Sequence, residues 1–160
     1  MMLLFTTAFA ASPSFRTQTL TALVEMFDDH SEIRFSGTTN GAETHKMSIL
    51  WMPDGYQIGL EEFDESRMII RADGENGENL DVAATAISKN RSYSFDTEGA
   101  IEESAMVQNN EAGVYQMKTE KGDKITVLWT DMEKGWIVRV TGYNISKEDM
   151  LRISESVEIR

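Results

Sequence analysis

The sequence has no cysteine and only two histidines in 160 residues. The absence of cysteine excludes disulfides, thiol catalysis and cysteine-based zinc sites, and is compatible with either redox compartment. With only His30 and His45 present, histidine-rich catalysis and metal binding are not expected. No Gly-x-Ser-x-Gly nucleophile elbow occurs either. We therefore predict no enzyme activity, and no catalytic, cofactor-binding or metal-binding residues.

Basic residues are scarce: 15 Lys and Arg stand against 27 Asp and Glu, which gives a formal net charge of −12. Arg16 is the only charged residue before position 25, so residues 25–160 carry −13. Nucleic-acid binding draws its affinity from Lys and Arg, so we predict no nucleic-acid partner. The acidity indicates either a solvated, colloidally stable surface, which we favour, or attraction to a basic partner or to cations.

Long apolar runs are also lacking, apart from the uncharged residues 1–11. As a helix these would reach roughly 16 Å, about half of a bilayer core. Three interpretations remain open: a signal-peptide core without its basic region, part of a transmembrane helix that begins upstream, or a buried N-terminal helix. We favour the transmembrane segment, and expect further apolar residues preceded by Lys or Arg if the reading frame extends upstream.

Residues 12–30 follow this leader, with Pro13 near their start. Proline is tolerated in the first turn of a helix. Apolar residues then recur near helical spacing, at Phe15, Leu20, Leu23, Val24 and Phe27. These features predict an amphipathic juxtamembrane helix over 12–30, followed by a single α+β domain over 31–160.

Apolar runs of strand length, joined by turn residues, fill most of that domain. We predict strands at 31–36, 46–51, 56–60, 67–72, 80–87, 101–107, 114–118, 124–130 and 136–141. The tetrapeptide Met52-Pro53-Asp54-Gly55 predicts a turn, and residues 89–99 are expected to be irregular. The last three strands before 131 should form a meander, because their joints are short.

The last forty residues show the clearest pattern. Alternation predicts two antiparallel strands, with Ile125, Val127 and Trp129 on one core face and Trp136, Val138 and Val140 on the other. A helix should follow, capped by Ser146 with Asp149 three residues on. Its buried residues should be Met150, Leu151, Ile153 and Val157.

This ending resembles a known bacterial family. Met52-Pro-Asp-Gly-Tyr56, the strand ending in Leu128-Trp129, the strand 135–142 and the helix 145–157 are similar to the domain of unknown function 4367. The resemblance covers most of 12–158, and its motifs are structural. It implies a domain outside the membrane behind a single transmembrane helix, sometimes linked to a segment that resembles an anti-sigma factor.

Two clusters suggest metal binding. Asp73 to Asp81 places oxygen-bearing side chains at alternate positions, as calcium loops do, but its fifth and twelfth positions are Gly77 and Ala84. Asp28-Asp29-His30 is typical of a solvated helix end. We favour a plain hairpin loop for the first and no metal for either.

Two further groups of residues suggest other chemistry. The acidic run Glu61-Glu62-Phe-Asp64-Glu65 would place neighbouring carboxylates on opposite faces of a strand, so we interpret it as an edge rather than a catalytic pair. The aromatic residues could line a lipid or glycan pocket, but core packing is favoured. They are Trp51, Trp129, Trp136, Tyr115 and Tyr143.

The predicted fold is α+β: a curved, mostly antiparallel sheet of six to eight strands, with the C-terminal helix on one face and an N-terminal juxtamembrane helix. The predicted function is a non-enzymatic, membrane-tethered extracytoplasmic binding or sensory domain, the outer part of an anti-sigma-factor-like regulator being one form. The alternative is a carrier or chaperone of lipophilic cargo. Expected partners are the membrane, through the N-terminal segment, and a protein or small ligand.

Overall fold

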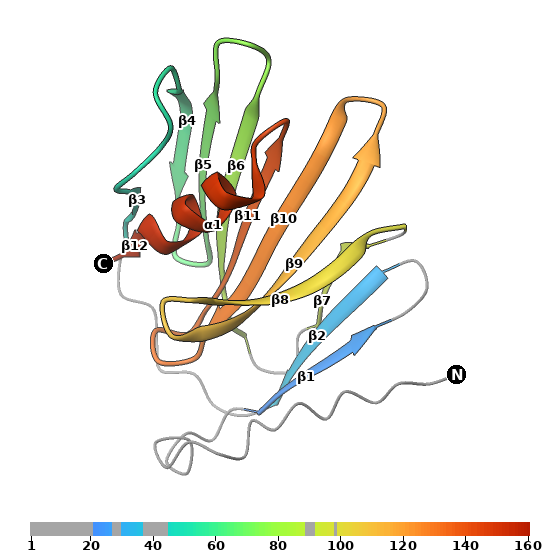
Figure 1. Ribbon diagram of the computed structural model, residues 1–160. Helices are drawn as coiled ribbons and strands as arrows, with labels where there is room; N and C mark the ends of the chain where they lie inside the picture. Colours follow the sequence, from blue (N-terminus) through green and yellow to red (C-terminus); the bar gives the residue numbers. More distant parts are fainter. Residues whose placement is uncertain (1–20, 27–29, 37–44, 89–91, 98) are drawn as a thin grey trace. The chain divides into compact units, whose positions relative to one another are not determined.

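The computed structural model describes residues 21–26, 30–36, 45–88, 92–97 and 99–160 (Figure 1). These residues belong to two units. One unit is formed by Met1–Asn40 with Ile87–Glu98, and the other by Gly41–Ala86 with Gly99–Arg160. In both units the described strands pair antiparallel, and the second unit also contains the helix α1.

The first unit contains a three-stranded sheet with the order β1-β2-β7. Its strands are β1 Thr21–Met26, β2 His30–Ser36 and β7 Ser92–Asp96. All six residues of β1 pair with β2 in unbroken register, from Thr21 opposite Ser36 to Met26 opposite Ser31. The strand predicted at 31–36 is thus confirmed.

Two predictions fail in this unit. The helix predicted over 12–30 is wrong for Thr21–Met26, which is a strand, while residues 12–20 and 27–29 lie outside the described residues. Positions 20, 22, 24 and 26 are apolar as well, so the segment also carries a strand period, and pairing with β2 satisfies its backbone groups. Ser92–Asp96 was expected to be irregular, yet it pairs with β2 along five residues.

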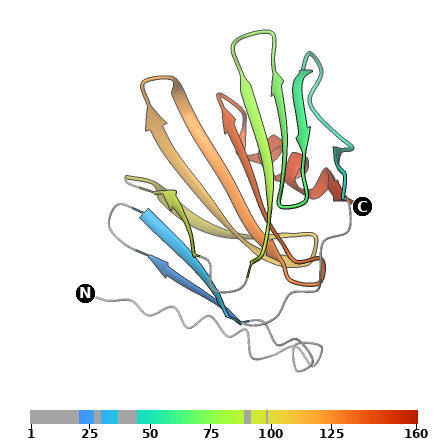
Figure 2. The ribbon, with the colours of Figure 1, turned by 180° about the vertical axis from the view of Figure 1, so that it is seen from behind.

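The second unit is built on a seven-stranded antiparallel sheet with the order β4-β5-β6-β11-β10-β9-β8. Seen from behind, these strands lie in front of the helix (Figure 2). This confirms the predicted α+β class with a mostly antiparallel sheet and a C-terminal helix. The strands are β4 Gln57–Phe63, β5 Arg67–Asp73, β6 Asn79–Ala86, β8 Ile101–Val107, β9 Asn110–Thr119, β10 Gly122–Asp131 and β11 Trp136–Tyr143.

The register of the sheet follows the predicted alternation. Val127 lies opposite Val140, and Trp129 lies opposite Val138, so the two predicted core faces are the same face of the sheet. The meander β8–β9–β10 is confirmed as well. Below α1 these positions form one buried apolar cluster with residues of β5, β6 and β9.

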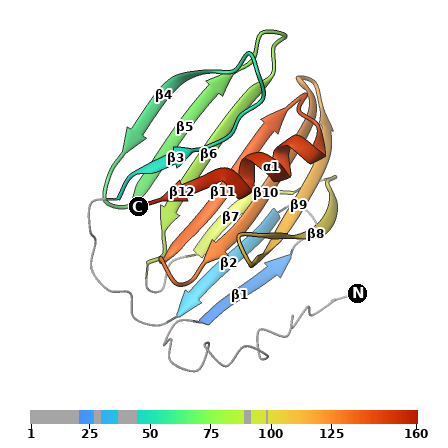
Figure 3. The ribbon, with the colours of Figure 1, turned by 60° about the vertical axis from the view of Figure 1, so that its left-hand side comes forward.

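The helix α1, Lys147–Ser156, covers this cluster (Figure 3). Ser146 caps it as predicted: its Oγ accepts a hydrogen bond from the Asp149 N–H at 3.1 Å and donates to the Asp149 carboxylate at 2.7 Å. Met150 and Ile153 are fully buried against the sheet. Val157 was expected to belong to the helix but begins the strand β12 Val157–Ile159, because it pairs with Ile49 of β3 Met47–Ile49.

Candidate functional site

The helix α1 is attached to the edge strand β8 at its N-terminal end and to the turn after β8 at its C-terminal end. At the N-terminal end, the Lys147 ammonium forms an ion pair with the Glu103 carboxylate, which lowers the pKa of Glu103. At the C-terminal end, the Gln108 backbone N–H donates to the Glu155 carboxylate at 3.1 Å, and its side-chain amide donates to the Ser154 carbonyl at 3.3 Å. Gln108 thereby adds to the local cap of the helix end, in which the Val157 N–H also donates to the Ser154 carbonyl.

The other side of α1 is attached to the segment before β4. The Ser156 hydroxyl donates to the Trp51 carbonyl at 3.1 Å, and the Leu50 N–H donates to the Ser156 carbonyl at 3.0 Å. The Arg152 guanidinium lies 3.9 Å from the centre of the Trp51 ring, within the range of a cation–π interaction. Strand β12 continues this attachment by pairing with β3.

Between these attachments the helix contacts the sheet directly. Gly142 of β11 lies beneath it: a β-carbon at this position would come within 2.4 Å of the Met150 sulfur and 2.7 Å of the Ile145 Cδ1. Glycine therefore permits the close approach of helix and sheet. The helix-covered face is filled by protein side chains, so it offers little room for a ligand.

The aromatic residues considered as a pocket are mainly part of this core. Trp129 and Trp136 are each 2% exposed and belong to the buried cluster, and Tyr115 is 6% exposed. Trp51 is half-buried and packs against the cluster, and Tyr143 is half-buried on β11. The core interpretation is confirmed for Trp129 and Trp136, whereas Tyr115 is buried on the opposite face of the sheet, where it lies opposite Thr126.

The loop compared with a calcium site is the turn between β5 and β6. Gly74 N–H donates to the Glu78 carbonyl at 2.9 Å, and the Glu78 carboxylate accepts from the Asn76 N–H at 2.8 Å. The Asp73 carboxylate accepts from the Asn79 side chain at 2.7 Å. These oxygens thus accept hydrogen bonds within the turn, and the segment is the hairpin loop that was predicted.

Metal ligands are not gathered elsewhere in the described ranges: no three Asp, Glu or His side chains there are placed to hold an ion together. His30 lies on β2, while Asp28 and Asp29 are outside the described residues.

The acidic run 61–65 lies on the edge strand β4 and its turn to β5. Glu61 and Glu62 are neighbours on the strand, opposite Ile70 and Ile69. The Asp64 carboxylate accepts from the Ser66 N–H and the Arg67 N–H, both at 2.7 Å, which lowers the pKa of Asp64. The acidic run therefore belongs to an exposed edge strand and to the turn that follows it, as predicted.

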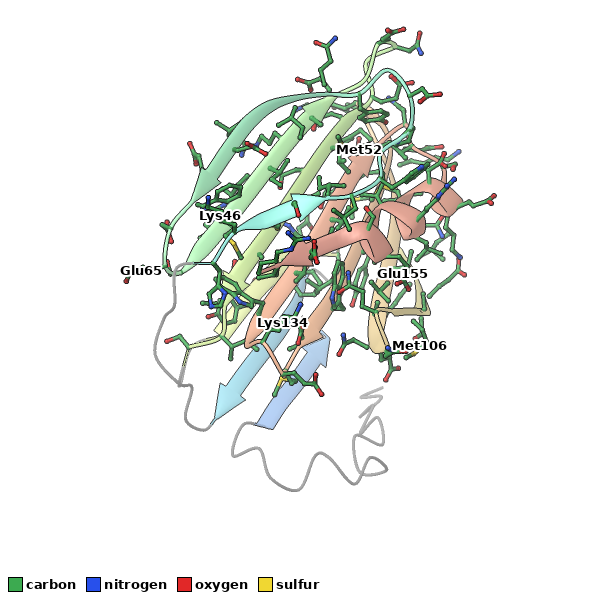
Figure 4. The ribbon with its side chains drawn as sticks, turned by 90° about the vertical axis from the view of Figure 1, so that its left-hand side faces the viewer. Lys46, Met52, Glu65, Met106, Lys134 and Glu155 are labelled. Atoms are coloured by element: carbon green, nitrogen blue, oxygen red, sulfur yellow. The ribbon has the colours of Figure 1, made fainter. Side chains whose placement is uncertain are left out.

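The two edges of the main sheet carry exposed apolar side chains. On β4 these are Ile58 and Phe63, at 45% and 39% exposure, and on β8 they are Ile101 and Met106, at 70% and 61%. Figure 4 shows Met106 on the β8 side and Glu65, in the turn after β4, on the opposite side. Edge strands have backbone groups without a neighbouring strand, so both are candidate binding surfaces.

The edge at β4 has a feature that the sequence did not reveal. Its register with β5 shifts between Ile58 and Leu60, which marks a bulge at Gly59. A hollow of about 350 Å³ lies beside it, lined by Gly55, Gln57, Ile58, Gly59, Asp73, Gly74 and Glu75. Glycine at position 59 was a possible signal, since glycine within a strand often marks a bulge.

An antiparallel sheet with one covering helix defines the class of fold, and the sequence places the chain within a family. Residues 46–157 match the model of the domain of unknown function DUF4367. The chain belongs to this family, as the resemblance predicted. No curated protein and no solved structure gives a significant match. Within the described residues, no helix has the length and apolar character that crossing a bilayer requires.

Proposed function

We propose that this chain is a non-enzymatic binding domain that stands outside the cytoplasm, is tethered to a membrane through its N-terminal segment, and recognises another protein in a sensory or regulatory role. The observation that carries the proposal is the contrast between the two kinds of surface. The helix-covered face is filled by Met150, Ile153 and the sheet core, whereas both sheet edges expose apolar side chains.

The pKa shifts of the surface carboxylates agree with a binding domain rather than with an enzyme. The carboxylates with a lowered pKa, Asp64, Glu78 and Glu103, all lie at the surface and take part in turns or in an ion pair. A general acid or base near neutral pH usually has a pKa shifted toward 7 by burial or by a like charge. The pKa values of these three described carboxylates are lowered, which is away from neutral pH.

A lipid carrier is the alternative, and the packing favours it less. A cavity for an acyl chain would require α1 to move away from Gly142, which would break the contacts of Gln108 and Trp51 with the helix end. Native mass spectrometry of the protein purified from membranes tests this point. We expect the mass of the bare chain, whereas one bound lipid per chain would favour the carrier.

The proposed location is supported by the apolar residues 1–11, and it has a separate test. Alkaline phosphatase joined after Arg160 in the native gene should be active, because its disulfides form only in an oxidising compartment. The matched control is a reporter that works only in the cytoplasm, joined at the same position. A silent phosphatase with a bright cytoplasmic reporter would contradict the extracytoplasmic placement.

A further inference from the structure

The backbone of β4 offers hydrogen-bonding groups at regular intervals. Asp64 N–H donates to the Arg67 carbonyl at 2.8 Å, so Asp64 and Arg67 form a hydrogen-bonded pair. Bonded and non-bonded pairs alternate along an antiparallel ladder. Phe63 and Glu61 therefore direct their N–H and C=O groups away from β5, toward the open side of the sheet.

The side chains of the same residues form one face of this edge. Ile58, Glu61 and Phe63 lie opposite Ala72, Ile70 and Met68, so they share the face that α1 covers farther along the sheet. All three are exposed. A strand added here would meet an apolar, an acidic and an apolar side chain in turn.

The hollow at the bulge adds a pocket at the start of this edge. Asp73 and Glu75 contribute carboxylates to its lining. A β-carbon at Gly59 would have only the Asp73 Oδ2 near it, at 3.8 Å, so this carboxylate oxygen faces the hollow beside the glycine. The pocket thus has the chemistry to accept a basic side chain.

The charge of this region is concentrated. Residues 54–78 contain eight acidic and two basic residues, so they carry −6 of the formal net charge of −12. Among the described residues, ion pairs are formed by Asp81, Glu103 and Glu158, but not by Glu61, Asp73 or Glu75. Like charges disfavour pairing of this edge with a second copy, whereas a basic segment is attracted.

We propose that β4 binds an extended basic segment of a partner protein, which adds an antiparallel or parallel strand to the sheet and places one Lys or Arg in the hollow at Gly59. The inference rests on the proposed function, because it names the surface and the chemistry of the partner. The backbone of Glu61 and Phe63 supplies affinity, and the acidic side chains select the partner.

The probe is a synthetic peptide, Val-Thr-Lys-Thr-Val-Thr-Lys-Thr-Val, capped at both ends and labelled for fluorescence anisotropy. Lysine and valine share one face of its extended form. The control peptide has proline in place of the two central threonines, which keeps the charge but prevents a continuous ladder. At about 150 mM salt, where surface charges are screened beyond roughly 8 Å, we expect at least tenfold tighter binding of the first peptide.

Three variants of the protein locate the site. Glu61→Pro removes an N–H that points away from β5, and Gly59→Leu fills the hollow; each should weaken binding about tenfold or more, in keeping with about 1.4 kcal/mol per factor of ten. Gly59→Ala, whose β-carbon meets Asp73 at an ordinary distance, should bind more tightly than Gly59→Leu. Ser104→Pro on β8 is the control at the other edge. Circular dichroism confirms that each variant folds.

The results of these experiments distinguish a failure of the β4 binding site from a failure of the proposed function. Equal binding of both peptides, or binding that Glu61→Pro and Gly59→Leu leave unchanged, would overturn the β4 site. Binding lost only in Ser104→Pro would also overturn it, while keeping a protein-binding role at β8. The phosphatase fusion and the native mass test the proposed function without involving β4.

Discussion

The backbone N–H of Gln108 lies 3.1 Å from the carboxylate oxygens of Glu155, although the two residues are 47 positions apart. Gln108 is in the turn between β8 and β9, and its side-chain amide also donates to carbonyls at the end of α1. The helix has no basic residue in its last turn, and this glutamine adds to the local cap, in which the Val157 N–H donates to the Ser154 carbonyl.

Replacing Gln108 by glycine should therefore destabilise the domain. Glycine accepts the φ of 51° found here, so the change removes the side-chain amide without adding backbone strain. Losing the hydrogen bonds of this amide predicts a loss of about 0.5–1.5 kcal/mol in the free energy of unfolding, since the Ser154 carbonyl keeps the Val157 N–H as a partner. Urea denaturation measures it. Asn109→Gly is the matched control in the same turn, with φ 64°, and should leave stability nearly unchanged or slightly raised.

The second prediction concerns Ile153, which is fully buried between α1 and the sheet. Ile153→Ala should reduce the free energy of unfolding by about 2–5 kcal/mol, because it leaves a cavity in a packed core. Glu148→Ala, an exposed position of the same helix, should cost less than about 1 kcal/mol. Equal urea midpoints for the two variants would show that α1 does not pack as described.

The third prediction concerns the ion pair between Glu103 and Lys147. This pair lowers the pKa of Glu103 below its ordinary value of 4.5, so its contribution to stability is present above pH 4.5 and is lost as the pH falls through the lowered pKa. Glu103→Gln should therefore be less stable than the natural chain at pH 7 and equally stable in acid. Glu102→Gln, its exposed neighbour, is the control and should show no such convergence. Thermal melts at several pH values make the comparison.

Sequence periodicity located most strands because apolar residues recur at every second position along them. Ile125, Val127 and Trp129 have this spacing, which is typical of a strand, although Thr126 and Leu128 between them are buried as well. The capped start of α1 was predictable for a similar reason, since Ser146 and Asp149 act within one turn. Sequence patterns predict an element correctly where the contacts that stabilise it lie within the same segment.

The errors occur where a distant partner decides the structure. Thr21–Met26 carries both a helical and a strand period, and pairing with β2 selects the strand. Val157 continues the helical spacing of Ile153 but pairs with Ile49, more than one hundred residues away. The hollow at Gly59 was hidden for the same reason: it needs Asp73 of the adjacent strand. No single segment contains that information.

The last prediction concerns Tyr56, which lies between the end of the β5–β6 hairpin and the start of α1. Burial raises its pKa from 10.0 to about 12, and the carboxylates of Glu78 and Asp149 add to the shift. A raised pKa in the folded state means that this contribution to stability is complete below pH 10 and is lost as the pH rises toward 12, because the unfolded chain releases the proton first. Tyr56→Phe, which cannot ionise, should therefore lose less stability than the natural chain across this range. Ultraviolet absorbance of the phenolate provides a second measurement: the variant should lack a phenol that titrates near pH 12. If the absorbance that the variant lacks titrated near pH 10 instead, Tyr56 would be solvated and the prediction would be wrong.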